Sequence, residues 1–318
     1  MKKFIRALLL FFIPILVLAY PLDLFISHNL KKSNKVYGEY EVWNDIYNSK
    51  IKSDMLIYGS SRAWVDISPE ILEDSLKIRV YNLGMDGHNF WLQYLRHLEY
   101  LKFNNRPKHI ILTVDFNSLQ KRGNLYLYEQ FLPYMLWNKS IKDFTKSYEG
   151  FTFFDYDIPL IRYFGNSSKV KDGISIGLGS YKSKPFRIKG YRGNTNSWSK
   201  DLENAKSKLK IYKIHIDTAS VTLFDRFLKE CKNNNIKVSL VYTPEHIDGQ
   251  KFIENKSLIT NLYKSYAEKY DLIYLDYSED SICLSKNYFY NATHLNKIGS
   301  ELFTKKLAND LLSQQFME

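Results

Sequence analysis

The chain has 318 residues, of which 45% are hydrophobic and 16% aromatic. This composition excludes disorder along the whole length and predicts one large domain, or one domain that carries an insertion. The net charge is +11, but no nucleic-acid-binding motif accompanies it, so we predict a lysine-rich, solvated surface near a membrane and no nucleic-acid partner.

A basic start and a long apolar run open the chain. Lys2, Lys3 and Arg6 precede the apolar residues. This pattern is typical of a signal peptide or of an uncleaved membrane anchor. Because no small-residue cleavage site follows, we favour a single-pass anchor over residues 1–27, and the basic residues predict that the remainder lies outside the cytoplasm. Residues 28–52 are then expected to form a stalk.

Apolar runs alternate with amphipathic stretches in most of the remaining chain. Short apolar runs that end in turn residues predict five strands, at 54–58, 78–83, 109–114, 236–243 and 272–275. Apolar residues at helical spacing predict helices at about 69–76, 89–103, 221–231, 252–270 and 297–312. This order predicts a three-layer α/β/α domain over residues 53–318, with a five-stranded parallel sheet.

A long interruption follows the third predicted strand. Residues 119–216 are rich in Tyr, Phe, Trp and Lys and show no alternation of strands and helices. A structureless loop of this length is improbable in a compact domain. We therefore predict an inserted cap or subdomain above the ends of the strands.

Small and polar turns follow four of the predicted strands. These turns lie at residues 59–61, 84–87, 115–117 and 243–244. Because ligands bind beyond the carboxyl ends of parallel strands, the turns are expected to form one shared site.

Two segments far apart in the chain carry candidates for nucleophilic chemistry. Ser61 lies in the turn after the first strand, and His294 lies just before the last amphipathic stretch. A serine hydroxyl is a weak nucleophile until a base accepts its proton, and a histidine can be that base. We predict that the two form a nucleophile–base pair; the alternatives are a plain turn and a structural histidine.

The order and spacing of these segments resemble the SGNH (GDSL-like) hydrolase superfamily over about residues 54–118 and 236–313. The first block of that family is Gly-Asp-Ser, with the serine as nucleophile. Here the block reads Gly-Ser-Ser-Arg, as in membrane-anchored bacterial members, and Ser61 takes the serine position. The resemblance implies a flavodoxin-like fold of the SGNH type. The long interruption and the apolar N-terminal run add to this fold a large insertion after strand 3 and an N-terminal membrane helix.

The second and third blocks imply an oxyanion hole. The family's Asn-x-x-x-x-Gly pattern is matched from Asn82 to Gly87, which assigns the backbone N–H of Gly87 to that role. The third block, Gly-x-Asn-Asp, is matched only by Asn117, whose side chain would be a second donor. Together with the N–H of Ser61, these groups would stabilise a tetrahedral oxyanion.

The last block departs from the family at one position. The family has Asp-x-x-His, but this chain has Asn291 three residues before His294. An aspartate orients the ring and stabilises imidazolium, whereas an asparagine carries no charge. Three alternatives remain open: a Ser–His dyad suffices, another carboxylate substitutes (Asp276, Asp280 or Asp86), or the site is catalytically weak.

The resemblance implies ester chemistry by a serine esterase or O-acyl (acetyl) transferase, without a metal or organic cofactor. The predicted anchor and the aromatic-rich insertion suggest a cell-envelope polysaccharide as the substrate. The expected location is the bacterial cell membrane, with the domain in the periplasm or at the cell surface. The alternative is a catalytically inactive SGNH-fold protein that binds glycan or takes part in envelope assembly. Cys231 and Cys283 have no metal-binding spacing, and Cys231 falls on the apolar face of a predicted helix.

Overall fold

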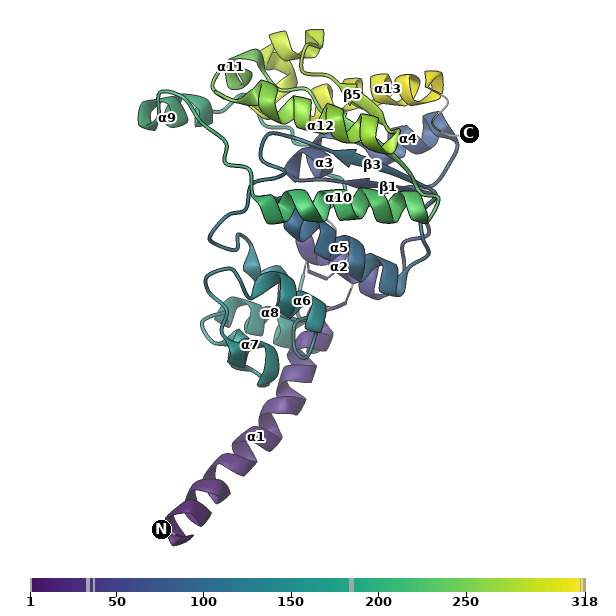
Figure 1. Cartoon of the computed structure of the whole chain (residues 1–318). Helices are drawn as coiled ribbons and strands as arrows, with labels where there is room; N and C mark the ends of the chain where they lie inside the picture. Colours follow the sequence, from purple (N-terminus) through teal and green to yellow (C-terminus); the bar gives the residue numbers. More distant parts are fainter. Residues whose placement is uncertain (1, 33–34, 37, 183–185, 315, 317–318) are drawn as a thin grey trace. The chain divides into compact units, whose positions relative to one another are not determined.

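The computed structural model describes residues 2–32, 35–36, 38–182, 186–314 and 316. The chain divides into two compact units (Figure 1). Unit 1 comprises residues 1–45 and 122–186, and unit 2 comprises residues 46–121 and 187–318. Unit 1 therefore combines the predicted anchor with much of the predicted insertion, and unit 2 contains the predicted α/β domain.

Unit 2 is built on a parallel sheet with the strand order β2-β1-β3-β4-β5. The strands are β1 (Met55–Tyr58), β2 (Val80–Asn82), β3 (His109–Thr113), β4 (Lys237–Tyr242) and β5 (Ile273–Asp276). All residues of β1 and β3 are buried, as expected for central strands covered on both faces. The prediction of five parallel strands is confirmed.

Helices cover both faces of this sheet. The helices of unit 2 are α3 (Ser61–Asp66), α4 (Pro69–Leu76), α5 (Phe90–Phe103), α9 (Asp201–Lys208), α10 (Thr218–Asn233), α11 (Ile247–Gln250), α12 (Lys256–Tyr270) and α13 (Lys297–Ser313). On one face, Ile57 belongs to the same apolar cluster as Leu72 of α4 and Phe303 of α13. On the other face, the ring of Tyr58 contacts that of Phe227 in α10. Successive residues of β1 thus pack against the helices on opposite faces of the sheet.

A small antiparallel hairpin precedes α13. After the 3-10 helices η3 (Ser281–Leu284) and η4 (Lys286–Tyr288), the chain forms β6 (Phe289–Asn291) and β7 (His294–Leu295). Asn296 then caps α13, because its side-chain oxygen accepts a hydrogen bond from the N–H of Gly299 at 3.0 Å. The hairpin and the cap fix the backbone on both sides of His294.

Unit 1 is helical. It contains α1 (Lys2–Leu30), most of α2 (Glu39–Tyr47), η1 (Tyr128–Phe131), α6 (Lys139–Thr145), α7 (Phe153–Asp157), η2 (Ile161–Tyr163) and α8 (Ser167–Gly177). Glycines let α8 approach α1 closely: a Cβ at Gly173 would lie 2.9 Å from Cγ2 of Ile26. Trp43 of α2 is fully buried and donates to Oε1 of Gln130, so this part of the predicted stalk packs within unit 1.

The predicted anchor coincides with one continuous helix, α1. Within the part of the chain that the structure describes, no helix has the combination of length and apolar character that crossing a membrane requires. The prediction of a membrane-spanning helix is therefore not supported.

Candidate active site

Ser61 is the first residue of α3 and follows a tight turn at the carboxyl end of β1. Gly59 has φ +147°, and a Cβ there would lie 1.8 Å from Oγ1 of Thr113, so only glycine fits. Ser60 caps α3 by accepting a hydrogen bond from the N–H of Arg62 at 3.3 Å. This turn presents the half-buried Ser61 at the edge where the strands end.

The structure brings Ser61 and His294 together across 233 positions of the chain. Ser61 Oγ lies 2.7 Å from His294 Nε2, within hydrogen-bonding distance. The ring of Tyr290 stacks on the imidazole, with centroids 5.3 Å apart and planes inclined by 13°. The predicted pairing of hydroxyl and imidazole is therefore present, while the catalytic roles of the two residues stay predictions.

Asn291 fixes which nitrogen of His294 carries the proton. Its Oδ1 accepts hydrogen bonds from the backbone N–H groups of Thr293 at 3.1 Å and His294 at 3.0 Å. The same oxygen lies 2.9 Å from His294 Nδ1. Because an amide oxygen only accepts, Nδ1 must donate, and Nε2 is left free to accept the Ser61 proton. This hydrogen-bond pattern assigns the tautomer that a general base requires.

The groups that contact His294 Nδ1 carry no charge. Besides Asn291 Oδ1, they include the hydroxyl of Thr293 at 3.0 Å. Burial, and then the nearby Arg62 cation, lower the pKa of His294 to about 3, against a smaller opposing effect of Asp201. Of the carboxylates considered as substitutes, Asp280 pairs with Lys306 and Asp276 accepts from the N–H of Ser278.

The two other predicted oxyanion donors follow the strands on either side of β1. Gly87 lies in the turn after β2 with φ +69° and is half-buried. Asn117 lies after β3, is exposed, and donates its backbone N–H to Oδ1 of Asp115 at 2.7 Å. Since β2 and β3 are the neighbours of β1, both residues lie at the same sheet edge as Ser61. Their role in binding an oxyanion stays a prediction.

Arg62, a buried arginine next to Ser61, was not identified from the sequence as part of the site. Arg62 is 3% exposed and donates from Nη1 to Oε1 of Glu245 at 2.5 Å. Its Nη2 donates to the carbonyl oxygens of Thr243 and Pro244, and its guanidinium lies over the ring of Tyr242. Arg62 thereby ties the start of α3 to the loop after β4.

Asp66, at the end of α3, connects this charged group to the histidine hairpin. Its Oδ1 accepts the backbone N–H of Leu295 at 3.0 Å, and its Oδ2 accepts the hydroxyl of Thr243 at 3.1 Å. Burial raises the pKa of Asp66 to about 8, although Arg62 at 3.9 Å acts in the opposite direction. The i, i+4 spacing of Arg62 and Asp66 directly after Ser61 was the available sequence signal for this group.

Ser60 joins the first and third loops of the site. Its Oγ donates to Oδ2 of Asp115 at 2.7 Å, and Asp115 is 3% exposed. The position that holds aspartate in the family's first block thus holds a hydroxyl here, and that hydroxyl binds a carboxylate from the loop after β3. Among the residues that the structure describes, no three His, Cys, Asp or Glu side chains gather as a metal-binding group.

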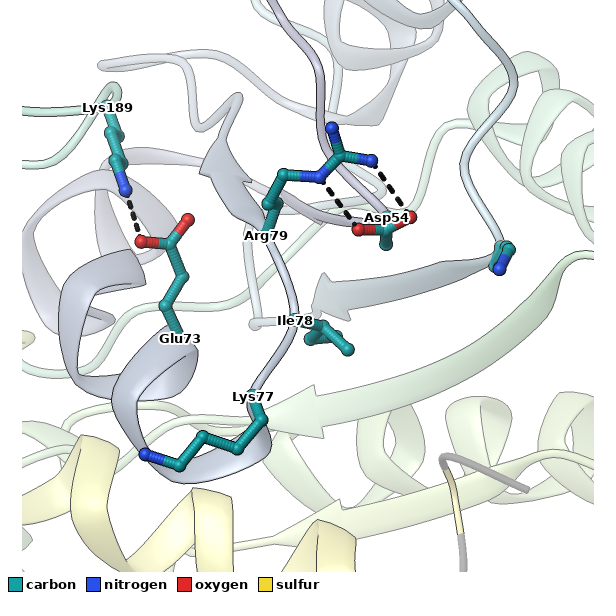
Figure 2. Close-up of a pocket in the computed structure, with 7 residues that line it drawn as sticks. Asp54, Glu73, Lys77, Ile78, Arg79 and Lys189 are labelled. Carbon is teal, nitrogen blue, oxygen red and sulfur yellow. Dashed lines mark hydrogen bonds and ion pairs between the residues drawn. The ribbon is translucent and has the colours of Figure 1, made fainter.

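A separate pocket lies at the opposite edge of the sheet (Figure 2). It is lined by residues that come just before strands, including Asp54 before β1, Arg79 before β2 and Lys108 before β3. Arg79 Nε pairs with Asp54 Oδ2 at 3.0 Å, and Lys189 pairs with Glu73. Because parallel strands begin at one edge and end at the other, this pocket is no part of the serine site.

Fold and site together define an α/β protein with a Ser–His–Asn constellation at the carboxyl edge of a parallel sheet. No protein-family model matches the chain, and neither does any curated protein.

Several solved structures are similar to it. A protein from Streptococcus pneumonia, assigned provisionally as a platelet activating factor, has 12% identity and a TM-score of 0.43, over 86% of this chain and 90% of that one. The esterase EstA from Pseudoalteromonas sp. has 9% identity and a TM-score of 0.39, over 83% and 100%. A GDSL-like lipase from Bacteroides thetaiotaomicron has 11% identity and a TM-score of 0.34, over 80% and 87%. Because these values are low, the similarities carry no argument about activity, and the function is inferred from the site.

Proposed function

We propose that the chain is a serine hydrolase that cleaves acyl esters, with Ser61 as nucleophile and His294 as general base. The observation that carries the proposal is the 2.7 Å contact between Ser61 Oγ and His294 Nε2, in a ring whose other nitrogen is held by Asn291 Oδ1. An activated hydroxyl on a strand-to-helix turn is the arrangement that acyl transfer requires.

The reaction follows from this geometry. Ser61 Oγ attacks the ester carbonyl carbon while its proton passes to His294 Nε2, and the carbonyl electron pair moves to the oxygen. The N–H groups of Ser61 and Gly87 and the amide of Asn117 are the proposed donors to that oxyanion. Collapse of the intermediate breaks the bond to the alcohol, which takes the proton from Nε2. Water then cleaves the acyl-serine by the same route, or an acceptor hydroxyl takes the acyl group.

The finer proposal concerns the substrate and the location. We propose an acyl, for example acetyl, ester on an envelope polysaccharide outside the cytoplasm. The many aromatic residues of the predicted insertion, and the ring of Tyr290 next to His294, support a sugar substrate, because flat rings bind the apolar faces of sugars. The basic residues ahead of the apolar N-terminal run support the location.

The test is labelling by a fluorophosphonate probe, together with hydrolysis of p-nitrophenyl acetate. We expect the wild-type chain to be labelled and the S61A variant to lose both labelling and hydrolysis. The matched control is S207A, which removes an exposed serine hydroxyl of α9 and leaves the Ser61–His294 pair in place. Equal labelling of S61A and the wild type would refute the assignment.

A second function is favoured by one observation. The groups behind His294 are the neutral side chains of Asn291 and Thr293, which do not stabilise an imidazolium. A non-catalytic protein that binds glycan or takes part in envelope assembly would tolerate the lack of a charged group beside His294. Such a protein would bind acetylated polysaccharide in calorimetry without any probe labelling of Ser61, and S61A would bind as tightly as the wild type.

A further inference from the structure

The first part of α1 is apolar around its whole circumference and is exposed. The side chains of Phe4, Leu10, Phe12, Ile13, Val17 and Leu18 are each between 47% and 69% exposed. At about 100° per residue, these positions point in all directions around the helix axis. A protein groove covers one face of a helix, whereas a helix that is apolar on every side matches a lipid environment. Figure 1 shows this part of α1 projecting away from the other helices of unit 1.

This exposed part ends where α1 becomes enclosed by the other helices of unit 1. Asp23 is 1% exposed and accepts hydrogen bonds from the guanidinium of Arg162 at 2.6 and 2.7 Å. One turn later, Ser27 Oγ lies 2.8 Å from the hydroxyl of Tyr163. Buried polar pairs therefore hold the second part of the helix within the protein, and the boundary falls between residues 18 and 23.

Exposed aromatic side chains gather at that boundary. Trp137 is 60% exposed, and its ring contacts that of Tyr20, with centroids 5.4 Å apart. Its N–H and Nε1 donate to the carbonyl oxygens of the last two residues of α7, so the end of α7 lies beside it. The first two residues of α7, Phe153 and Phe154, are 63% and 55% exposed. Tyrosine and tryptophan rings of this kind concentrate where apolar lipid meets water.

Trp137 combines an unusual backbone conformation with an exposed ring. Trp137 has φ +56°, a conformation that is costly for a bulky residue. Its large apolar ring is left mostly outside the protein. Beside it, Lys142 Nζ lies 4.5 Å from the centroid of Phe153, which places a cation next to the exposed rings.

We propose that the first part of α1, together with Trp137, Phe153 and Phe154, forms one lipid-binding surface, and that unit 1 rests on the headgroup region of an anionic phospholipid bilayer. The apolar side chains enter the acyl region, and the aromatic rings lie at its border. Lys3 and Arg6 at the start of α1 supply positive charge for anionic headgroups. This inference does not depend on the proposed enzymatic activity.

The first experiment measures the depth of Trp137 in vesicles. The full chain is bound to vesicles of phosphatidylcholine and phosphatidylglycerol whose acyl chains are brominated either near the headgroup or near the chain end. The difference in fluorescence between the wild type and W137F reports Trp137. We expect bromine near the headgroup to quench this difference more strongly than bromine near the chain end. A chain that binds vesicles while Trp137 stays unquenched by both lipids would overturn the proposed surface.

The second experiment measures vesicle binding by flotation. We expect the triple variant W137S, F153S and F154S to bind about tenfold more weakly than the wild type, because each change removes apolar area from the lipid contact. The matched control carries serine at three similarly exposed apolar positions of unit 2, Leu209, Leu258 and Ile298, and should bind like the wild type. Equal binding of both triple variants, or no flotation of the wild type with anionic vesicles, would overturn the proposal.

Discussion

The two sides of the candidate site are supported in opposite ways. Ser61 starts a helix that is held by buried charges, since Arg62 pairs with Glu245 and lies near Asp66. His294 is held by neutral acceptors, the oxygens of Asn291 and Thr293. The largest effect of any charge on the imidazole comes from Arg62, a cation on the serine side, which lowers the pKa of His294. The site therefore fixes geometry and tautomer, but it does not stabilise a protonated base.

The largest expected effect comes from removing either member of the central pair. We expect S61A and H294A each to lower kcat for an activated ester by about 10⁴-fold or more, because nucleophile and base act as one unit. The double variant should lose no more than either single one. Steady-state hydrolysis of p-nitrophenyl acetate measures this, and a double variant with a clearly additive loss would contradict joint action.

The next effect concerns the charged support of the serine side. The R62M variant leaves the buried Glu245 without its cation, which should lower the free energy of unfolding by about 3–5 kcal/mol. Urea denaturation measures the change. The R62M/E245M double variant is the control, because it removes both charges and should recover part of the loss. A single-variant loss below about 1 kcal/mol would show that the pair contributes little.

A carboxylate introduced next to His294 tests whether the neutral support of this histidine limits the reaction. The N291D variant places a negative charge at Nδ1 of His294 and favours imidazolium, so we expect kcat/KM to rise about 10-fold to 100-fold. The N291A variant is the control and should be less active than the wild type, because it loses the acceptor that sets the tautomer. Unchanged activity in N291D would mean that the missing charge does not limit the reaction.

The pH dependence of kcat/KM distinguishes N291D from the wild type. Because the pKa of His294 is lowered from 6.5 to about 3, the ring stays neutral in mildly acidic solution. We expect kcat/KM of the wild type to stay level down to about pH 5, and the acid limb of N291D to lie at higher pH.

The same shift makes a stability prediction. The unfolded chain binds a proton at this histidine near pH 6.5 and the folded chain does not until about pH 3. The contribution of neutral His294 to the stability of the fold is therefore fully present above pH 6.5. It is lost as the pH falls from 6.5 to about 3. Denaturation of the wild type and of H294Q at several pH values checks this, since the variant lacks the titrating group. Parallel stability curves for the two would contradict the lowered pKa.

The smallest effect is expected for Thr293. The T293V variant removes a hydroxyl 3.0 Å from His294 Nδ1 but leaves Asn291 Oδ1 in contact with it. One net hydrogen bond is worth about 0.5–1.5 kcal/mol, so kcat/KM should fall by about tenfold at most. A larger loss would make Thr293, rather than Asn291, the principal acceptor of the ring proton.

Much of unit 2 could be predicted from the sequence because its strands are buried on both faces. Their apolar runs are nearly continuous, and the start of α4 follows from Ser68 and Pro69, which the structure places as N-cap and first residue. The prediction for α12 began at residue 252, whereas the helix begins at Lys256, because residues 251–255 form turns and an isolated bridge to Tyr212. The β6–β7 hairpin could not be predicted, since strands of two or three residues show no periodicity.

Unit 1 and the support of the site depend on contacts between distant residues. The ion pair of Asp23 and Arg162 joins residues 139 positions apart, and that of Arg62 and Glu245 joins residues 183 positions apart. Sequence patterns over a few neighbouring residues do not indicate which distant residues will pair. Ser61 and His294 could be placed together because Ser61 follows a recognisable strand and His294 precedes a recognisable helix. The orientation of Asn291, by contrast, depends on a turn of only a few residues.

The chain's two thiols have a practical consequence. Cys231 and Cys283 are free and each is 1% exposed, and burial raises the pKa of both. Protonated thiols that solvent does not reach react slowly with maleimides. A cysteine introduced at an exposed position, as in F153C or N117C, would therefore take up a spin label or fluorophore selectively while the native cysteines stay in place.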